Sequence, residues 1–160
     1  MEHSITKYRK EPYKILYQNI NRLVSKNSKK KINYLKECVQ ENKILIMNFT
    51  ETWLDDSINN IIDINGYQVW RGDRKGRQGG GTAIYLHEDF ESNLMMSDSF
   101  ESCEITAIFI EKLNTINIVI YRPPDARSSA FNAIIDKTET LLVKMDKLEP
   151  NVIIRSDFNF

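Results

Sequence analysis

The chain has 160 residues, of which 41 % are hydrophobic and 28 % are charged, and its formal net charge at pH 7 is zero. This is about the length of one domain, with enough apolar residues for a core, and the balanced charge gives no overall field that would favour nucleic acid or a membrane. No apolar stretch approaches the about 20 residues that span a bilayer, and the polar residues 1–12 do not resemble a signal peptide. We therefore expect no membrane partner.

The two cysteines, Cys38 and Cys103, lie far apart and form no CxxC motif. This spacing excludes a zinc ribbon and argues against a disulfide scaffold, so we expect an intracellular location, nuclear or cytoplasmic. Basic residues are dense over 26–36 and 71–77. The simplest interpretation of these runs is a solvated helix face and a solvated loop, and phosphate binding is the alternative.

Residues 1–12 are interpreted as a polar lead-in, and the domain is expected to occupy residues 13–160. An alternating, β-prone segment predicts a strand over about 13–19. A continuous apolar run predicts a second strand over 43–51, buried on both faces. The segment between these strands has helical periodicity, and a strand–helix–strand order indicates α/β layering.

The first predicted helix lies between these two strands. Ile32, Leu35 and Val39 share one of its faces, with lysines on the opposite face. Either Ser25 or Ser28 is expected to cap its N-terminus, because a serine hydroxyl can accept a hydrogen bond from an unpaired backbone N–H.

The middle of the chain predicts short strands joined by irregular segments. Residues 52–80 are mostly irregular, with a short strand near Tyr67–Trp70, and 80–90 contains another strand. Two further strands are expected within 103–124, joined by a hairpin-like turn at Leu113–Asn114. The proline pair at the end of this segment stops the second strand, because proline cannot donate to a strand ladder.

An amphipathic helix and a last strand complete the predicted order. Residues 128–150 carry apolar side chains at helical spacing, with Ser128 or Ser129 as the expected cap, and 151–156 predict a strand. No linker divides the chain into two domains.

Polar residues at the ends of the predicted strands form the first candidate site. Asn19 ends the first strand, Glu51 the second, and Asp157 and Asn159 follow the last. In layered α/β proteins strand ends converge on one crevice, and Mg²⁺ prefers oxygen ligands, usually one or two carboxylates with water and phosphate. Tyr121 also ends a strand and could donate to a phosphate oxygen. The alternatives are that the four polar residues cap strands or turns and that Tyr121 is a half-buried aromatic residue.

The segment "RGDRKGRQGGG", residues 71–81, is the second candidate. Its three consecutive glycines allow positive φ and a close backbone approach. Arg71, Arg74 and Arg77 could contact phosphates bidentately, so they are predicted nucleic-acid-binding residues. Neither a P-loop nor a GxGxxG fingerprint is present. The alternative is a mobile loop without a binding role.

Five segments taken together carry a resemblance: "KILYQNINRL", "NFTETWL", "WRGDRKGRQGGGTAIYL", "IVIYRPP" and "VIIRSDFNF", in that order. From about Tyr13 to Phe160 the chain resembles the endonuclease/exonuclease/phosphatase superfamily, in the form carried by non-LTR (LINE-type) retrotransposons. The resemblance implies a four-layer α/β sandwich of the DNase I-like type. It also implies cleavage of phosphodiester bonds with Mg²⁺ (or Mn²⁺), here nicking of DNA.

The resemblance also implies roles for five residues. Asn19 would be the active-site amide of the first strand, and Glu51 the metal-binding carboxylate. Tyr121 would contact the scissile phosphate. Asp157 would activate or orient the attacking water, and Asn159 would be its amide partner on the phosphate. Arg71 and the glycine loop would line the edge that faces DNA.

Two departures from the family pattern affect the expected activity. Ser156 stands where the family usually has glycine, and Arg155 precedes it. The family's domain continues to a Ser-Asp-His motif, which does not occur after Asp157 in this sequence. We therefore expect a domain that is incomplete at its C-terminus and weak or inactive as an enzyme. We also expect its last strand to have an uncovered edge.

Other readings of the chain also stay open. One is a non-catalytic retroelement relic that binds nucleic acid or protein, and another is an enzyme of the same superfamily that acts on a phosphomonoester. An intact element would carry a reverse transcriptase downstream, which is the expected partner.

Overall fold

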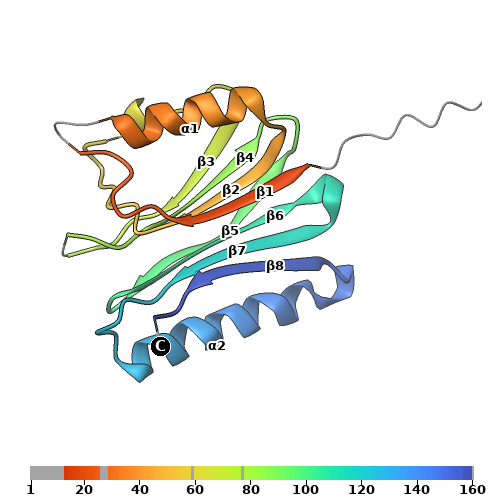
Figure 1. The fold of residues 1–160 in the computed structure, drawn as a ribbon. Coiled ribbons are helices and arrows are strands. Elements are labelled where there is room, and N and C mark those ends of the chain that lie inside the picture. Colours follow the sequence, from red (N-terminus) through yellow and green to blue (C-terminus); the bar gives the residue numbers. More distant parts are fainter. Residues whose placement is uncertain (1–12, 26–28, 59, 77, 160) are drawn as a thin grey trace, which may run out of the picture.

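The computed structural model describes residues 13–25, 29–58, 60–76 and 78–159. Two four-stranded sheets lie face to face, with α1 on the outer side of one sheet and α2 on the outer side of the other (Figure 1). This is the predicted four-layer α/β sandwich. In the described part of the chain, no helix is long and apolar enough to cross a membrane.

The first sheet contains the first two predicted strands, and the predicted helix connects them. Its strand order is β1 (Lys14–Asn19), β2 (Ile44–Thr50), β4 (Thr82–His87) and β3 (Tyr67–Gly72). The strands β1 and β2 are parallel, and α1 (Lys30–Glu41) joins them. A helix is needed there because parallel strands cannot be joined by a tight turn.

The second sheet is built from the C-terminal half of the chain. Its order is β5 (Ser92–Phe100), β6 (Cys103–Ile110), β7 (Thr115–Tyr121) and β8 (Asn151–Asp157). The strands β7 and β8 are parallel, and α2 (Ser128–Met145) crosses between them. Three short 3₁₀ helices lie at Asn60–Ile62, Glu111–Leu113 and Asp146–Leu148. Each sheet therefore contains one parallel pair, and the two strands of a pair end at the same edge of the sheet.

The strand β5 was not predicted from the sequence, and the predicted helix caps were wrong. The segment "SNLMMSDSF" of β5 has no regular alternation, and its pairing with β6 shifts register between Leu94 and Met96. The residue before α1 is Lys29, not Ser25, and it makes no side-chain capping bond, while Ser28 lies outside the described residues. Arg127 precedes α2. Because Ser128 and Ser129 are already helical, neither of them occupies the cap position.

The space between the two sheets contains paired polar side chains as well as apolar ones. Asn48 on β2 and Asn117 on β7 are both fully buried, and Asn117 Nδ2 donates to Asn48 Oδ1 over 2.8 Å. The hydroxyls of Thr82 and Thr106 lie 2.7 Å apart in the same interface. Each pair links one sheet to the other, so these contacts favour one register of the two sheets.

Replacing Asn48 with alanine is expected to lower the free energy of unfolding by about 1–3 kcal/mol, because the buried amide of Asn117 loses its partner. Urea denaturation followed by circular dichroism measures this loss. Asn132→Ala is the matched control, since Asn132 is exposed on α2. Equal stability of the two variants would contradict the assigned role of the amide pair.

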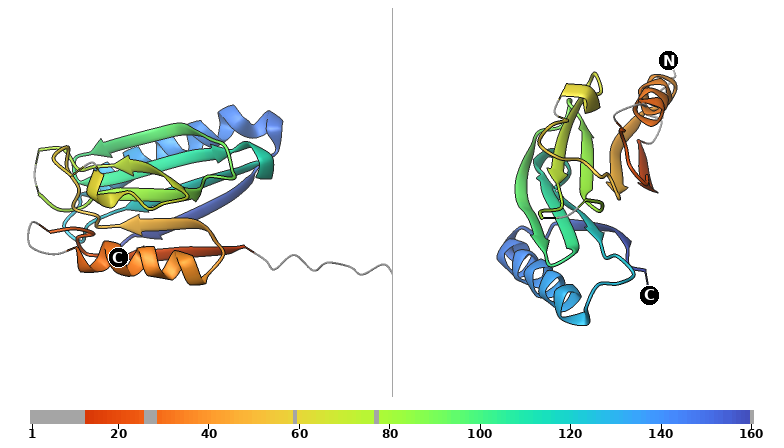
Figure 2. Two further views of the ribbon diagram at one scale, coloured as in Figure 1. Left: turned by 90° about the horizontal axis from the view of Figure 1, so that it is seen from above. Right: turned by 90° about the vertical axis from the view of Figure 1, so that its left-hand side faces the viewer.

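The edge strands β1 and β8 lie on the same side of the sandwich, as the right-hand view of Figure 2 shows. Val152 and Ile154 of β8 are each 43 % exposed. Among the described residues, no strand pairs with the outer edge of β8. Among these residues β8 is thus an edge strand, and an unpaired strand edge favours pairing with a further strand.

Candidate active site at one end of the sandwich

Four of the predicted site residues lie where parallel strands end. Asn19 is the last residue of β1, and Glu51 directly follows β2. Tyr121 ends β7, and Asp157 ends β8. All four strand ends lie at the left-hand end of the molecule in Figure 1. The parallel pairing within each sheet therefore brings all four residues to the same end.

Two hydrogen bonds join these residues across the sheets. Asn19 Nδ2 donates to Asp157 Oδ2 over 2.6 Å, and the Tyr121 hydroxyl donates to Glu51 Oε1 over 2.7 Å. Each bond connects a residue of the first sheet to one of the second. The structure thus brings the four strand-end residues together in two pairs, a pairing that was not predicted from the sequence.

The environment of Tyr121 keeps its hydroxyl protonated at neutral pH. Burial raises the pKa of Tyr121, and the hydrogen bond to Glu51 and the charge of that carboxylate raise it further. Arg74 opposes this effect, and the charge of Asp157 adds to it. Tyr121 is therefore a neutral hydrogen-bond donor that lies within the electrostatic range of both carboxylates.

The backbone after β1 and β2 adopts a conformation that non-glycine residues rarely take. Asn21, Arg22, Glu51 and Trp53 have φ values of 42°, 68°, 54° and 55°. Such left-handed residues cost about 1–2 kcal/mol each, and they cluster at functional sites. No glycine marks this feature in the sequence, so pattern analysis missed it.

Backbone hydrogen bonds hold these two strained segments together. The amide of Ile20 donates to Thr50 O over 3.0 Å, and that of Arg22 donates to Glu51 O over 2.7 Å. The parallel pairing of β1 and β2 therefore continues past both strand ends. This continuation fixes the backbone that carries the Glu51 side chain.

Asn159 lies close in sequence to Asp157, but its side chain has another partner. Its Nδ2 donates to the carbonyl of Arg122 over 2.8 Å, and its own carbonyl accepts from Arg122 Nη1 over 2.7 Å. This reciprocal contact anchors the turn after β8. The structure does not place the Asn159 amide in the Asn19–Asp157 pair, and its role on a phosphate stays a prediction.

Two of the three arginines predicted to bind nucleic acid, Arg71 and Arg74, bond to other groups of the protein. Arg71 forms an ion pair with Asp73 and donates to Asp55 O over 3.0 Å. The Arg74 side chain is only 6 % exposed, and its Nε donates to the fully buried Glu104 over 2.6 Å. Arg77 lies outside the described residues. These contacts argue against a direct phosphate contact by Arg74.

The three consecutive glycines, residues 79–81, form a turn that packs on this buried ion pair; we call it the glycine turn. The amide of Gly81 donates to Glu104 Oε2 over 3.2 Å. A Cβ atom at Gly80 would lie 2.4 Å from the Arg74 guanidinium, and φ at Gly80 is +67°. Glycine is needed here for the close approach to Arg74 and for the positive φ.

The donors at the strand ends fit a hard divalent cation. The carboxylates of Glu51 and Asp157 and the amide of Asn19 supply oxygen atoms, and Mg²⁺ typically takes one or two carboxylates together with water and substrate phosphate. Across the described residues, no group of three or more His, Cys, Asp and Glu side chains converges. The oxygen donors of Asn19, Glu51 and Asp157 are of the kind that Mg²⁺ prefers, whereas zinc sites usually include nitrogen or sulfur ligands.

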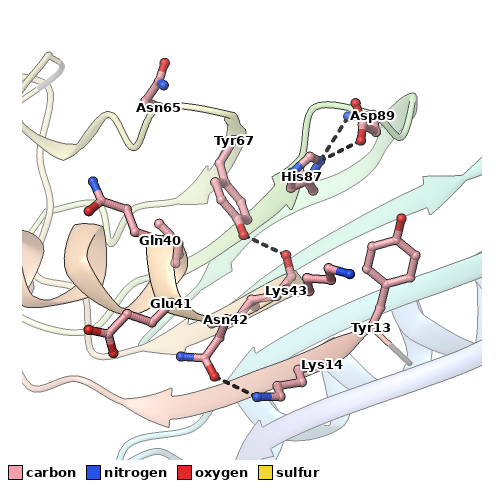
Figure 3. Close-up of a pocket in the computed structure, with 12 residues that line it drawn as sticks. Tyr13, Lys14, Gln40, Glu41, Asn42, Lys43, Asn65, Tyr67, His87 and Asp89 are labelled. Carbon is pink, nitrogen blue, oxygen red and sulfur yellow. Dashed lines mark hydrogen bonds and ion pairs between the residues drawn. The ribbon is translucent and has the colours of Figure 1, made fainter. Parts of the chain in front are cut away.

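A cavity of about 850 Å³ lies at the opposite end of the first sheet (Figure 3). Its polar groups bond to one another: Lys14 Nζ donates to Asn42 Oδ1 over 2.6 Å, and the Tyr67 hydroxyl donates to Ile44 O over 2.6 Å. Lys14 begins β1 whereas Asn19 ends it. The cavity is therefore separate from the strand-end site.

No protein-family model and no curated protein sequence matches the chain. Among solved structures it is similar to an AP endonuclease from Archaeoglobus fulgidus, with 20 % identity and a TM-score of 0.59 over 91 % of this chain and 57 % of that one. The endonuclease domain of TRAS1, a telomere-specific non-LTR retrotransposon, is 15 % identical with a TM-score of 0.60, over 92 % of this chain and 59 % of that domain.

The chain is also similar in structure to an endonuclease/exonuclease/phosphatase family protein from Bacteroides thetaiotaomicron. Its identity is 14 % and its TM-score 0.61, over 91 % of this chain and 61 % of that one. The chain thus has the endonuclease/exonuclease/phosphatase (DNase I-like) fold that the sequence resemblance implied, and it spans somewhat more than half the length of these structures.

Proposed function

We propose that residues 13–160 form part of a Mg²⁺- (or Mn²⁺-) dependent phosphodiester hydrolase domain that nicks DNA. The observation that carries this proposal is the joining of the two sheets by the Asn19–Asp157 and Glu51–Tyr121 pairs at one end of this fold. Two of the similar structures are endonucleases by name, and one of them belongs to a retrotransposon. DNA is accordingly the proposed substrate, and the reverse transcriptase of such an element is the proposed partner in the same compartment.

Each side chain of the proposed site can take a different role in phosphodiester hydrolysis. Asp157 accepts the hydrogen bond of Asn19 and is the group proposed to orient the attacking water and take its proton. Tyr121 is a neutral donor that can turn from Glu51 to a phosphate oxygen. The metal ion, proposed to bind at Glu51, would neutralise the charge that builds on the phosphate oxygens.

Removing divalent metal is expected to abolish nicking. The experiment incubates the protein with supercoiled plasmid and Mg²⁺ or Mn²⁺ and measures the relaxed circle, with and without a chelator. A Glu51→Gln preparation, purified in the same way, controls for a contaminating nuclease. Equal nicking by both proteins, or nicking that persists in chelator, contradicts the proposal. DNA binding without nicking favours the alternative, a non-catalytic binding module.

A further inference from the structure

Arg22 forms a stack with Trp53 beside the strand-end site. The guanidinium carbon of Arg22 lies 4.4 Å from the centroid of the Trp53 ring. The glycine turn also packs against this indole, since a Cβ atom at Gly79 would lie 3.6 Å from it. A cation over an indole face is attracted by the ring quadrupole. Trp53 therefore holds the Arg22 side chain in one place.

Backbone hydrogen bonds connect the Arg22–Trp53 contact to the residues of the proposed site. The amide of Arg22 donates to the carbonyl of Glu51 over 2.7 Å, and the amide of Asn21 donates to Asn19 Oδ1 over 3.1 Å. Arg22 and Trp53 both have positive φ. A pair of large side chains is thus kept in an unfavourable backbone conformation next to Asn19 and Glu51, and such strain is characteristic of functional positions.

The charge of Arg22 is available for a ligand. Within residues 13–25, 29–58, 60–76 and 78–159, no carboxylate forms an ion pair with Arg22, whereas Arg71 and Arg74 are paired with Asp73 and Glu104. A guanidinium that lies over an aromatic ring can still present N–H donors in the fork that matches a phosphate.

We infer that Arg22, held over the Trp53 ring, binds a phosphate of the DNA backbone next to the cleavage site. Arg22 takes the role that the arginines of the 71–77 loop were predicted to have, and Trp53 is its positioning residue. The inference deepens the proposed function and rests on it, because it requires that the substrate is a nucleic acid.

The test measures DNA binding and not cleavage. Fluorescence anisotropy of a labelled double-stranded oligonucleotide is recorded in chelator over a series of salt concentrations. The slope of log K against log[salt] is expected to become shallower by about 0.9 in Arg22→Gln, the value for one lost phosphate contact. Lys144→Gln removes the same charge from the exposed last turn of α2 and is expected to leave the slope unchanged.

Two further variants separate a binding role from a structural one. Arg22→Gly suits the φ of 68° and is expected to fold at least as stably as the wild type while losing the same phosphate contact. Trp53→Leu breaks no hydrogen bond to a described residue, because its indole N–H has no partner there, and it is expected to weaken binding with Arg22 intact.

The outcomes distinguish this inference from the proposed function. Wild-type binding with an unchanged slope in Arg22→Gln and Arg22→Gly overturns the role of Arg22 and leaves the proposed function in place. An unchanged affinity in Trp53→Leu overturns the positioning role of Trp53. Absence of any salt-dependent binding by the wild type overturns both the inference and the proposed DNA substrate.

Discussion

Replacing Glu104 with alanine is expected to lower the free energy of unfolding by about 3–5 kcal/mol, the cost of leaving one partner of a buried ion pair alone. Glu104 is fully buried and accepts from Arg74 over 2.6 and 3.1 Å. Burial lowers the pKa of Arg74, but the bonds and charge of Glu104 raise it above its usual value, so the guanidinium stays charged. The variant would leave that charge buried and unpaired, and would also remove the acceptor of the Gly81 amide.

Urea denaturation followed by tryptophan fluorescence measures this loss. Glu139→Ala is the matched control, because Glu139 is exposed on α2 and alanine favours helix. The double variant Arg74→Met, Glu104→Leu is expected to recover part of the lost stability, since replacing both members of a buried pair by apolar groups removes the unpaired charge. A Glu104→Ala protein as stable as Glu139→Ala would contradict the assigned role of the pair.

Replacing Asp157 with asparagine is expected to reduce the nicking rate by about 10²–10⁴-fold, the usual contribution of a general base. The substitution keeps the size of the side chain and an oxygen for the bond from Asn19, so the fold should be retained. The initial rate of plasmid nicking under saturating Mg²⁺ measures the effect.

Asp136→Asn makes the same chemical change on the exposed face of α2 and controls for loss of negative charge. Tyr121→Phe is expected to have a smaller effect, because it removes one neutral donor and leaves both carboxylates in place. Nicking at the wild-type rate by Asp157→Asn would contradict the assignment of Asp157 as the base.

The strand-end residues could be predicted because their positions follow from local pattern and topology. Apolar runs identify β2, β7 and β8, and each run is followed directly by a polar or aromatic residue. Parallel strands joined by a helix must end at the same edge of a sheet, so Asn19, Glu51, Asp157 and Asn159 were expected at one edge, and Tyr121 was a separate candidate at a strand end. The strand β5 could not be predicted in this way, because its polar sequence carries no period-2 signal.

The sequence by itself determined the layered fold and the residue types at the strand ends, since both depend on local periodicity and chain order. Only the tertiary structure decided which charged groups are available to a ligand. Arg74, which follows β3, is neutralised by Glu104, thirty residues further along the chain in β6, while Arg22 is held on Trp53 without a carboxylate partner among the described residues. Charge pairing depends on distances of a few ångströms between segments that are remote in sequence, and no local pattern encodes those distances.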